Sequence, residues 1–337
     1  MAVFAAVLAG TVADLDWLSV YGGPATFLAG YRTSFHSIVA AVFLPIVLII
    51  VLGVLANRWG GMRIPLGNLG KDETIPVEPA ARRIFLFRRF FAYVLGAPVC
   101  AALLHLAMDT CQSDGVALLW PFSPKRFAAD WLPSIDPWIL TILIAAIALP
   151  ELLHLVGSEI GAKSKKPRGR TGAIVGLALV LVYVGARATL RSNVIALMES
   201  RTFHGETSRR ASAFPESLSL LTWHGVVETD SALNVIDVDA ASASNFDPDS
   251  SLRLFKPEPS PALEAARNTL AARRFLAVAQ IPKASLEKTE TGYVVVLRDL
   301  RYSAADETQH EIAALIKLDL NNKVISQELV WARDLRH

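Results

Sequence analysis

The chain has 337 residues, of which 53% are hydrophobic, and its mean hydropathy is +0.39. Few soluble proteins of this length are so apolar, so the composition argues against an ordinary soluble protein. The formal net charge of +2 says little in total, whereas the distribution of the charges along the chain is informative.

The apolar residues gather in blocks rather than being spread along the chain. Each block has the ~20 residues that a helix needs to cross ~30 Å of hydrocarbon. A buried helix of a soluble protein could explain one such block, but several in succession predict membrane spans. We therefore expect residues 1–200 to form a polytopic α-helical membrane domain. The expected spans are His36–Asn57, Phe90–Cys111, Pro137–Val156 and Thr171–Met198.

The loops between these blocks differ in their content of Lys and Arg. Residues 58–89 contain one Lys and six Arg, and residues 163–170 contain three Lys and two Arg, whereas residues 112–136 contain only Lys125 and Arg126. The positive-inside rule then places the two basic segments in the cytoplasm and residues 112–136 outside. The last span would carry the C-terminal domain outside as well. Nucleic-acid binding is the other interpretation of the basic runs, but topology accounts for them, and we expect no nucleic-acid partner.

Composition changes after Met198, and residues 205–337 are expected to form a small extracytoplasmic α+β domain with an antiparallel sheet. Helical periodicity predicts a helix over Ser260–Ala279, with Ser260 as its N-cap. The Ser-, Pro- and Asp-rich residues Asn245–Pro261 are expected to form an exposed loop. Alternating or β-branched runs predict strands at Trp223–Glu228, Leu233–Val238 and Tyr293–Tyr302, and a hairpin of Ala313–Leu320 with Lys323–Trp331 that turns at Asn321-Asn322.

Three polar clusters stand at the ends of apolar stretches. Asp14 and Asp16 follow the short apolar stretch Met1–Ala13, and His105 and Asp109 lie near the end of a span. The third cluster, YRTSFHS, opens another span and contains Arg32, His36 and Ser37. The topology given above places all three clusters on the outer side of the membrane.

The residue types and their spacing favour a metal site. His105 and Asp109 are four residues apart, so they share one face of a helix. Asp14 and Asp16 can converge on one cation only if the chain unwinds before the turn at Gly22-Gly23-Pro24. A mixed set of His and carboxylate ligands suits Zn²⁺ or Mn²⁺. The alternative is that these residues are helix caps and structural hydrogen-bonding partners at the membrane interface.

These residues also carry a resemblance. The segments DLDWL, YRTSFHS and HLAMDTCQSDGVALLWPFSPKRFAADWL resemble motifs of the YdjM-type family of LexA-regulated bacterial inner-membrane proteins, which are described as metal-dependent hydrolases. The family shows P-D-x-D, H-R-x-x-T-H-S, and S-H-x-x-x-D-x-x-T-x-x-G followed by a PFS segment. AFPESLSLLTWHGVVETD, FLAVAQIPKASLE and GYVVVLRDLRY resemble the C-terminal extension of many members.

The resemblance implies a multi-pass protein of the inner membrane that hydrolyses a membrane-associated ester or phosphoester. A membrane lipid or a lipid-linked molecule is the expected substrate. Asp14 or Asp16 would act as general base, and Arg32 would bind a phosphate oxygen. The residues that match the family motifs, and so form the expected polar centre, are Asp14, Asp16, Arg32, His36, Ser37, His105 and Asp109. The expected metal ligands among them are Asp14, Asp16, His36, His105 and Asp109.

The chain departs from the family pattern at two places. Tyr31 stands where the family has the first His of its second motif, and Phe35 stands in place of the Thr. Members also begin with a helix that bears a Thr-His pair, and nothing before Asp14 supplies one. These departures favour an alternative function, in which the protein is a non-catalytic membrane anchor with a degenerate metal site. Its outer domain would then bind a partner in the cell envelope.

Overall fold

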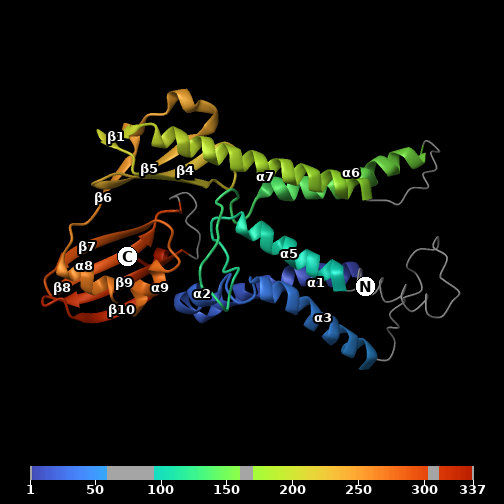
Figure 1. The fold of residues 1–337 in the computed structure, drawn as a ribbon, viewed down its shortest axis with the longest axis horizontal. Coiled ribbons are helices and arrows are strands. Elements are labelled where there is room, and N and C mark those ends of the chain that lie inside the picture. The colour runs from blue at the N-terminus through green and yellow to red at the C-terminus, as the bar shows by residue number, and fades with distance from the viewer. Residues whose placement is uncertain (1, 59–94, 160–169, 303–310, 336–337) are drawn as a thin grey trace. The chain divides into compact units, whose positions relative to one another are not determined.

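The computed structural model describes residues 2–58, 95–159, 170–302 and 311–335 (Figure 1). The chain divides into two compact units, and the segment Gln112–Asp114 belongs to the second of them. Unit 1 comprises Met1–Cys111 and Gly115–Ala128, and unit 2 comprises the remainder. These units meet near residues 111–129, whereas the sequence predicted a domain boundary near residue 200. That domain boundary stays a prediction. Most of the basic residues that set the expected orientation lie outside the described residues.

Three apolar helices pack together in unit 1. They are α1 (Ala2–Thr11), α3 (Ile38–Arg58) and α5 (Ala97–Thr110). Small side chains lie where the helices meet, because Ala9 and Ala41 are buried and a Cβ at position 10 of α1 would be in ordinary contact with α5. Small residues let helix backbones approach closely, which is how helices pack when lipid surrounds them.

A compact connection joins α1 to α3. The 3₁₀-helix η1 (Val12–Gly22) is followed by the short helix α2 (Pro24–Gly30), with the left-handed Gly23 (φ 84°) between them. Residues 115–128 pack against the entry to α3, since the N–H of Ala117 donates to the carbonyl of Arg32 and the N–H of Ile38 donates to the carbonyl of Leu118. The segment between α2 and α3 is therefore held at both of its ends.

In unit 2, two long helices form a hairpin, α6 (Pro137–Glu159) and α7 (Arg170–Glu199). They meet at Gly172 and Gly176, four residues apart on α7, which face Ala146 of α6. A Cβ at either glycine would overlap the carbonyl oxygen or the Cβ of Ala146. This spacing of small residues is typical of closely packed membrane helices.

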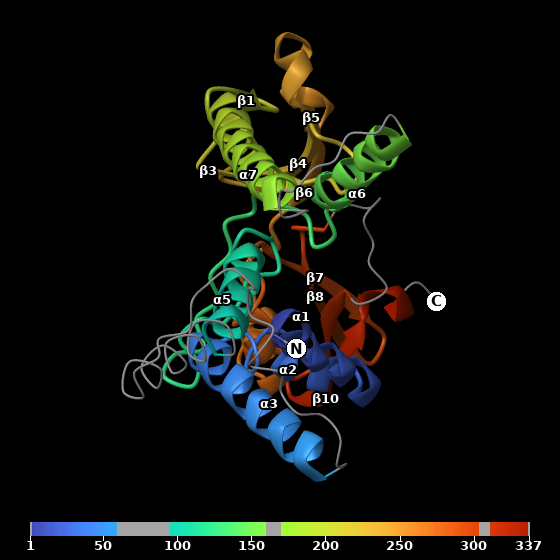
Figure 2. The same ribbon diagram turned by 90° about the vertical axis from the view of Figure 1, so that its right-hand side faces the viewer.

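The second half of α7 packs against the first antiparallel sheet, as Figure 2 shows. A buried core of Met198, Trp223 and Val227 joins helix and sheet. A two-stranded hairpin, β1 (Thr202–Phe203) with β2 (Glu206–Thr207), precedes the sheet. The order in the sheet is β3-β4-β5-β6, with β3 at Arg210–Pro215, β4 at Thr222–Glu228, β5 at Ala232–Asp239 and β6 at Leu252–Phe255.

The second antiparallel sheet carries two short helices, α8 (Pro261–Arg267) and α9 (Leu270–Leu276). Phe275, Val295 and Ile316 lie in the core that these helices form with the sheet. The order is β10-β9-β8-β7, with β7 at Pro282–Thr289, β8 at Gly292–Asp299, β9 at Ile312–Asp319 and β10 at Val324–Trp331.

Two local expectations are wrong. The single helix expected over Ser260–Ala279 is two helices, because Thr269 has an extended backbone and its hydroxyl caps α9 by accepting from the N–H of Ala272. The loop expected over Asn245–Pro261 contains the 3₁₀-helix η5 (Pro248–Ser250) and strand β6. Ser260 is the N-cap of α8, as expected.

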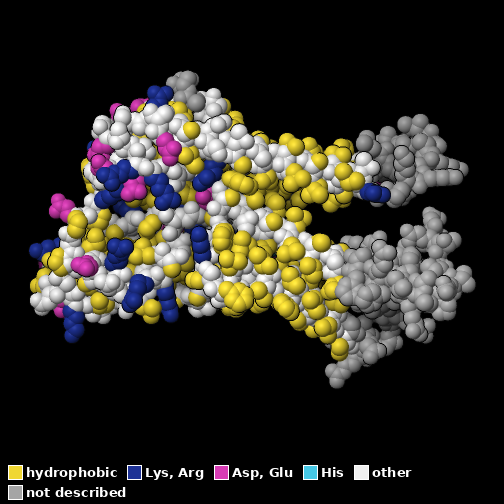
Figure 3. All heavy atoms as spheres, in the orientation of Figure 1, with side chains coloured by type: hydrophobic (Ala, Val, Ile, Leu, Met, Phe, Trp, Pro, Cys, Tyr) yellow, Lys and Arg dark blue, Asp and Glu magenta, His cyan; other side chains and the backbone are white. Residues whose placement is uncertain are grey.

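Among the described residues, α7 is the one helix whose length and composition suffice for a membrane span. The apolar parts of α3, α5 and α6 are shorter. Hydrophobic side chains nevertheless cover the visible face of the helices, whereas charged side chains gather over the sheets (Figure 3). Ile147 of α6 and Val182 of α7 are among the exposed side chains. Continuous apolar surface of this kind is typical of contact with a membrane or a partner protein.

Candidate metal centre

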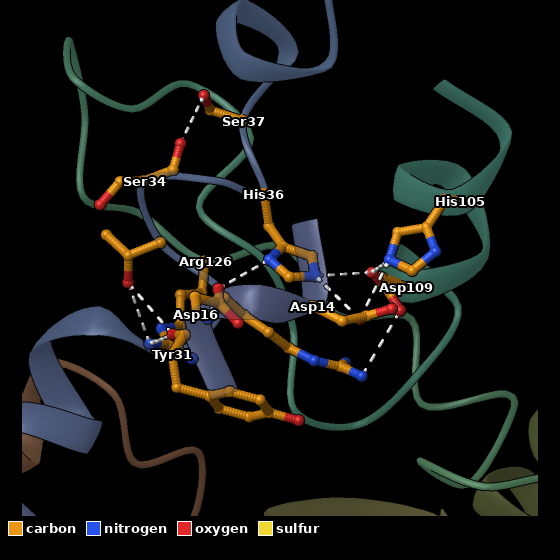
Figure 4. Close-up of polar contacts among 11 residues, drawn as sticks. Asp14, Asp16, Tyr31, Ser34, His36, Ser37, His105, Asp109 and Arg126 are labelled. Atoms are coloured by element: carbon orange, nitrogen blue, oxygen red, sulfur yellow. Dashed lines mark hydrogen bonds and ion pairs between the residues drawn. The ribbon is translucent and has the colours of Figure 1, made fainter. Parts of the chain in front are cut away.

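Three segments of unit 1 bring the expected polar residues together. The 3₁₀-helix η1 carries Asp14 and Asp16, the segment before α3 carries Arg32 and His36, and α5 carries His105 and Asp109 (Figure 4). The tighter 3₁₀ winding of η1 lets Asp14 and Asp16, two residues apart, both reach His36.

His36 is held in one orientation by Asp16. Its Nδ1 lies 2.8 Å from Oδ2 of Asp16, and the same oxygen accepts a hydrogen bond from the backbone N–H of Arg32 at 2.7 Å. Because a carboxylate can only accept, Nδ1 carries the proton and Nε2 presents a lone pair when the ring is neutral. The His36 side chain is 1% exposed. Asp16 therefore lies on the far side of the ring from the other carboxylates and orients the imidazole.

The remaining ligand atoms converge on Nε2 of His36. That nitrogen lies 3.2 Å from Oδ2 of Asp109 and 3.8 Å from Oδ1 of Asp14. Nε2 of His105 lies 3.1 Å from the same Asp109 oxygen and 3.4 Å from the same Asp14 oxygen. Ligands bound tetrahedrally at about 2.0–2.2 Å from Zn²⁺ are about 3.3–3.6 Å apart. These four separations are close to the ligand–ligand distances at a tetrahedral Zn²⁺ ion, and ligand atoms of Asp14, His36 and His105 all lie within 4.8 Å of one another.

Two atoms of this cluster lack the partners that buried polar atoms normally have. Nε2 of His105 and Oδ2 of Asp109 are buried and make no hydrogen bond to any described residue, although they lie 3.1 Å apart. Leaving such groups unsatisfied costs ~1–3 kcal/mol each. A cation between the two atoms would satisfy both.

With neutral imidazoles, the charge of the centre matches that of a divalent ion. Asp14, Asp16 and Asp109 contribute three negative charges and Arg32 contributes one positive charge, which leaves a formal charge of −2 when both imidazoles are neutral. A divalent cation would neutralise this charge. The residues therefore fit a divalent metal in donor type, in spacing and in charge.

Access to the centre is from the side of Asp14. The Asp14 side chain is 58% exposed, whereas that of Asp109 is 8% exposed. Partial burial raises the pKa of Asp14, but the neighbouring imidazoles of His105 and His36 outweigh it and hold that pKa below its usual range. A cavity of about 10 Å³ lined by His36 and His105 has room for no more than about one water molecule. A substrate would therefore approach over Asp14.

Arg32 and Ser37 have local partners. Nη2 of Arg32 lies 3.4 Å from Oδ1 of Asp109, so the guanidinium supports that carboxylate at the oxygen other than the one that His105 contacts. The hydroxyl of Ser37 accepts from the N–H of Ala40 and donates to the carbonyl of Ser34. Ser37 is thus the N-cap of α3.

Arg126 holds the segment before α3, a role that was not expected from the sequence. Its Nη2 donates to the carbonyl of Tyr31 at 2.7 Å and lies 3.4 Å from Oγ1 of Thr33. The ring of Tyr31 stacks on Phe27, with 4.6 Å between the ring centroids. The signal in the sequence was that Arg126 is one of only two basic residues in its loop. A partner 95 residues away could not be inferred from that signal.

Comparison with known proteins relates two parts of the chain to known families. A family model described as YdjM inner membrane protein matches residues 1–194, a range that contains every residue of the centre. A second model, described as YfhP C-terminal alpha/beta plait domain, matches residues 261–336, which contain α8, α9 and the second sheet. No curated protein and no solved structure matches the chain.

Proposed function

Because the chain belongs to the YdjM inner membrane protein family, we propose that it is a multi-pass membrane protein that hydrolyses a membrane-associated ester or phosphoester with the help of a divalent metal ion. The observation that carries the proposal is the convergence of Asp14, His36, His105 and Asp109. Nε2 of each imidazole lies 3.1–3.8 Å from a carboxylate oxygen of Asp14 and of Asp109.

The proposed spans are α3, α5, α6 and α7. The exposed apolar surface of these helices and the close packing of α6 on Gly172 and Gly176 support this arrangement. The Lys and Arg content of the loops supports a cytoplasmic location for residues 58–89 and 163–170. The metal centre and the C-terminal domain would then both lie on the extracytoplasmic side.

Nε2 of His36, Nε2 of His105, Oδ2 of Asp109 and Oδ1 of Asp14 would hold the ion, either Zn²⁺ or Mn²⁺. Asp16, which the sequence predicted as a ligand, would orient His36 instead. A hydrogen bond from the second ring nitrogen to a carboxylate is usual for ligating histidines. Arg32 would hold Asp109 in place. Its buried guanidinium is less suited to the phosphate-binding role predicted from the sequence.

Asp14 is the exposed carboxylate of the centre, so its Oδ2 would act as general base while its Oδ1 holds the ion. When bound, the metal would supply Lewis acidity and lower the pKa of a water molecule to about 7. Asp14 would accept a proton from the attacking water as the water oxygen bonds to the carbonyl carbon or phosphorus. The bond to the alcohol oxygen would then break, and that oxygen would take up a proton. His36 and Asp109 are buried, so the reacting bond would lie on the exposed side of Asp14.

Esters that lie in a membrane are the class of substrate that fits this placement. The centre sits where η1 begins and α5 ends, beside helices whose outer surfaces carry exposed apolar side chains such as Leu104 and Phe43. A lipid headgroup at the interface could reach Asp14 while its acyl chains stay in the bilayer.

The test is hydrolysis by the purified chain in lipid nanodiscs, loaded with Zn²⁺ or Mn²⁺. Fluorogenic phospholipid esters and phosphodiesters would be compared with water-soluble nitrophenyl analogues. Asp14→Asn should lower kcat ~10²–10⁴-fold, as the loss of a general base does. Asp230→Asn, at an exposed position far along the chain, is the matched control.

Equal hydrolysis by the wild type and by His105→Ala would contradict the proposal. Absence of hydrolysis together with retained metal would favour the alternative function, a membrane anchor whose outer domain binds an envelope partner. The departures at Tyr31 and Phe35 are the observations in favour of that alternative.

A further inference from the structure

A second group of potential metal ligands lies on the first sheet of unit 2. His224 of β4 and Asp237 of β5 are register partners, and Glu216 directly follows the end of β3. One ligand atom from each of the three residues lies within 4.8 Å of the other two. The group lies in residues 195–260, which neither family model covers.

The tautomer of His224 is fixed by the backbone. Its Nε2 lies 3.0 Å from the carbonyl oxygen of Leu300, and a carbonyl can only accept, so Nε2 carries the proton. Nδ1 then holds the lone pair of the neutral ring and lies 3.2 Å from Oδ1 of Asp237. Two acceptor atoms face each other at that distance only when a cation, either a proton or a metal ion, lies between them.

Glu216 adds a third potential ligand beside this pair. A proton on Nδ1 would involve Asp237 alone, whereas a metal ion would take one oxygen from each of the two carboxylates. Ligands at about 2.0–2.2 Å from one ion are at most about 4.4 Å apart, so ligand atoms that lie within 4.8 Å of one another need at most a small side-chain adjustment to close around an ion. One imidazole and two carboxylates are a ligand set that suits Zn²⁺ or Mn²⁺.

We infer that His224, Asp237 and Glu216 form a second divalent-cation site, which takes Zn²⁺ or Mn²⁺. The His224 side chain is 6% exposed and is anchored through its second nitrogen to a backbone carbonyl, the usual arrangement of a ligating histidine. The Asp237 side chain is 65% exposed, so water completes the coordination and the ion exchanges with solvent. Through Leu300, the site connects the first sheet to the end of β8.

The inference is tested by counting bound Zn²⁺ in the full-length chain, purified in detergent without a polyhistidine tag. Equilibrium dialysis at a fixed free Zn²⁺ concentration is followed by elemental analysis. The variants are Asp237→Asn, the double variant His105→Ala/Asp109→Ala, and the triple variant that combines them. Asp237→Asn is chosen because this exposed side chain can lose its charge without disturbing the sheet. Asp230→Asn is the control, since it removes an equally exposed carboxylate.

The number of Zn²⁺ ions bound per folded chain should be the sum of the ions bound at each independent site. Asp237→Asn should bind about one equivalent of Zn²⁺ less than Asp230→Asn. The double variant should keep about one equivalent of Zn²⁺, and the triple variant should lose it. Zn²⁺ should also raise the Tm of the double variant and not that of the triple variant. Equal metal content in Asp237→Asn and Asp230→Asn would overturn the inference. The metal centre of unit 1 is tested separately, by comparing the wild type with the double variant.

Discussion

Asp16 accepts a hydrogen bond from Nδ1 of His36, 2.8 Å away, and thereby turns Nε2 of the same ring toward Asp109 and Asp14. Asp16 thus has a different role from Asp14. One aspartate sets the orientation of the imidazole, and the other faces the nitrogen that would bind the metal.

Asp16→Asn should weaken metal binding while the chain still folds. The amide keeps the shape of the carboxylate but removes the charge that favours the proton on Nδ1. Losses of this kind typically lower metal affinity ~10–100-fold. Competition with a zinc-binding chromophore measures the affinity. Asp230→Asn should leave it unchanged, and an equal effect of the two variants would show that Asp16 does not act through His36.

The packing of α6 on α7 can be tested at the glycines of α7. A side chain at position 176 would collide with Ala146, whereas a Cβ at position 185 would meet no atom within 4 Å. Gly176→Leu should therefore lower the Tm in detergent, since overpacking typically costs ~1–3 kcal/mol. Gly185→Ala should leave the Tm unchanged or raise it slightly, because alanine is a better helix former than glycine. Equal Tm values for Gly176→Leu and the wild type would contradict the close packing.

Glu206 should contribute to the pH dependence of stability. Hydrogen bonds from the hydroxyl and the backbone N–H of Ser231 lower the pKa of Glu206 from 4.5 to about 2. A carboxyl whose pKa is lowered by folding stabilises the fold above its unfolded pKa and loses that contribution as the pH falls toward its folded pKa.

The Tm difference between the wild type and Glu206→Gln should accordingly be largest near neutral pH. It should shrink as the pH is lowered from 4.5 toward 2, because the carboxyl group then becomes protonated in the folded state as well. Scanning fluorimetry across this range measures the difference. Glu258→Gln, at another exposed glutamate, is the control. A difference that stays constant with pH would show that the hydrogen bonds to Ser231 do not favour the charged form.

Much of the fold could be predicted because its signals are local. Apolar blocks marked the helices, and the hairpin of β9 and β10 was confirmed at Asn321-Asn322, where Asn322 adopts a left-handed conformation. Strands β3 and β7 were missed. β7 is an edge strand that begins at a proline and has few buried side chains, so its sequence lacks a clear alternation. β3 is rich in small residues and owes its burial to the packing of α7 on the sheet.

Which residues lie together in the candidate metal centre could be predicted, whereas their mutual arrangement could not. The spacing of His105 and Asp109 placed both on one helical face, and the structure brings them to Asp14 and His36. Spacing alone does not show which carboxylate faces which nitrogen of His36, because this depends on the 3₁₀ winding of η1. The hydrogen bond from Arg126 to Tyr31 joins distant segments, so it too required the fold.

The most direct test of the central claim is the metal content of the purified chain in an Asp237→Asn background, in which the second inferred site is removed. After loading with Zn²⁺ or Mn²⁺ and dialysis, we expect about one equivalent of metal to remain, and we expect His105→Ala or Asp109→Ala to remove it. His204→Ala, which changes a histidine outside both ligand groups, should retain the metal. If the Asp237→Asn protein holds no metal after loading, or if His105→Ala and Asp109→Ala retain as much as His204→Ala does, then Asp14, His36, His105 and Asp109 are not a metal centre.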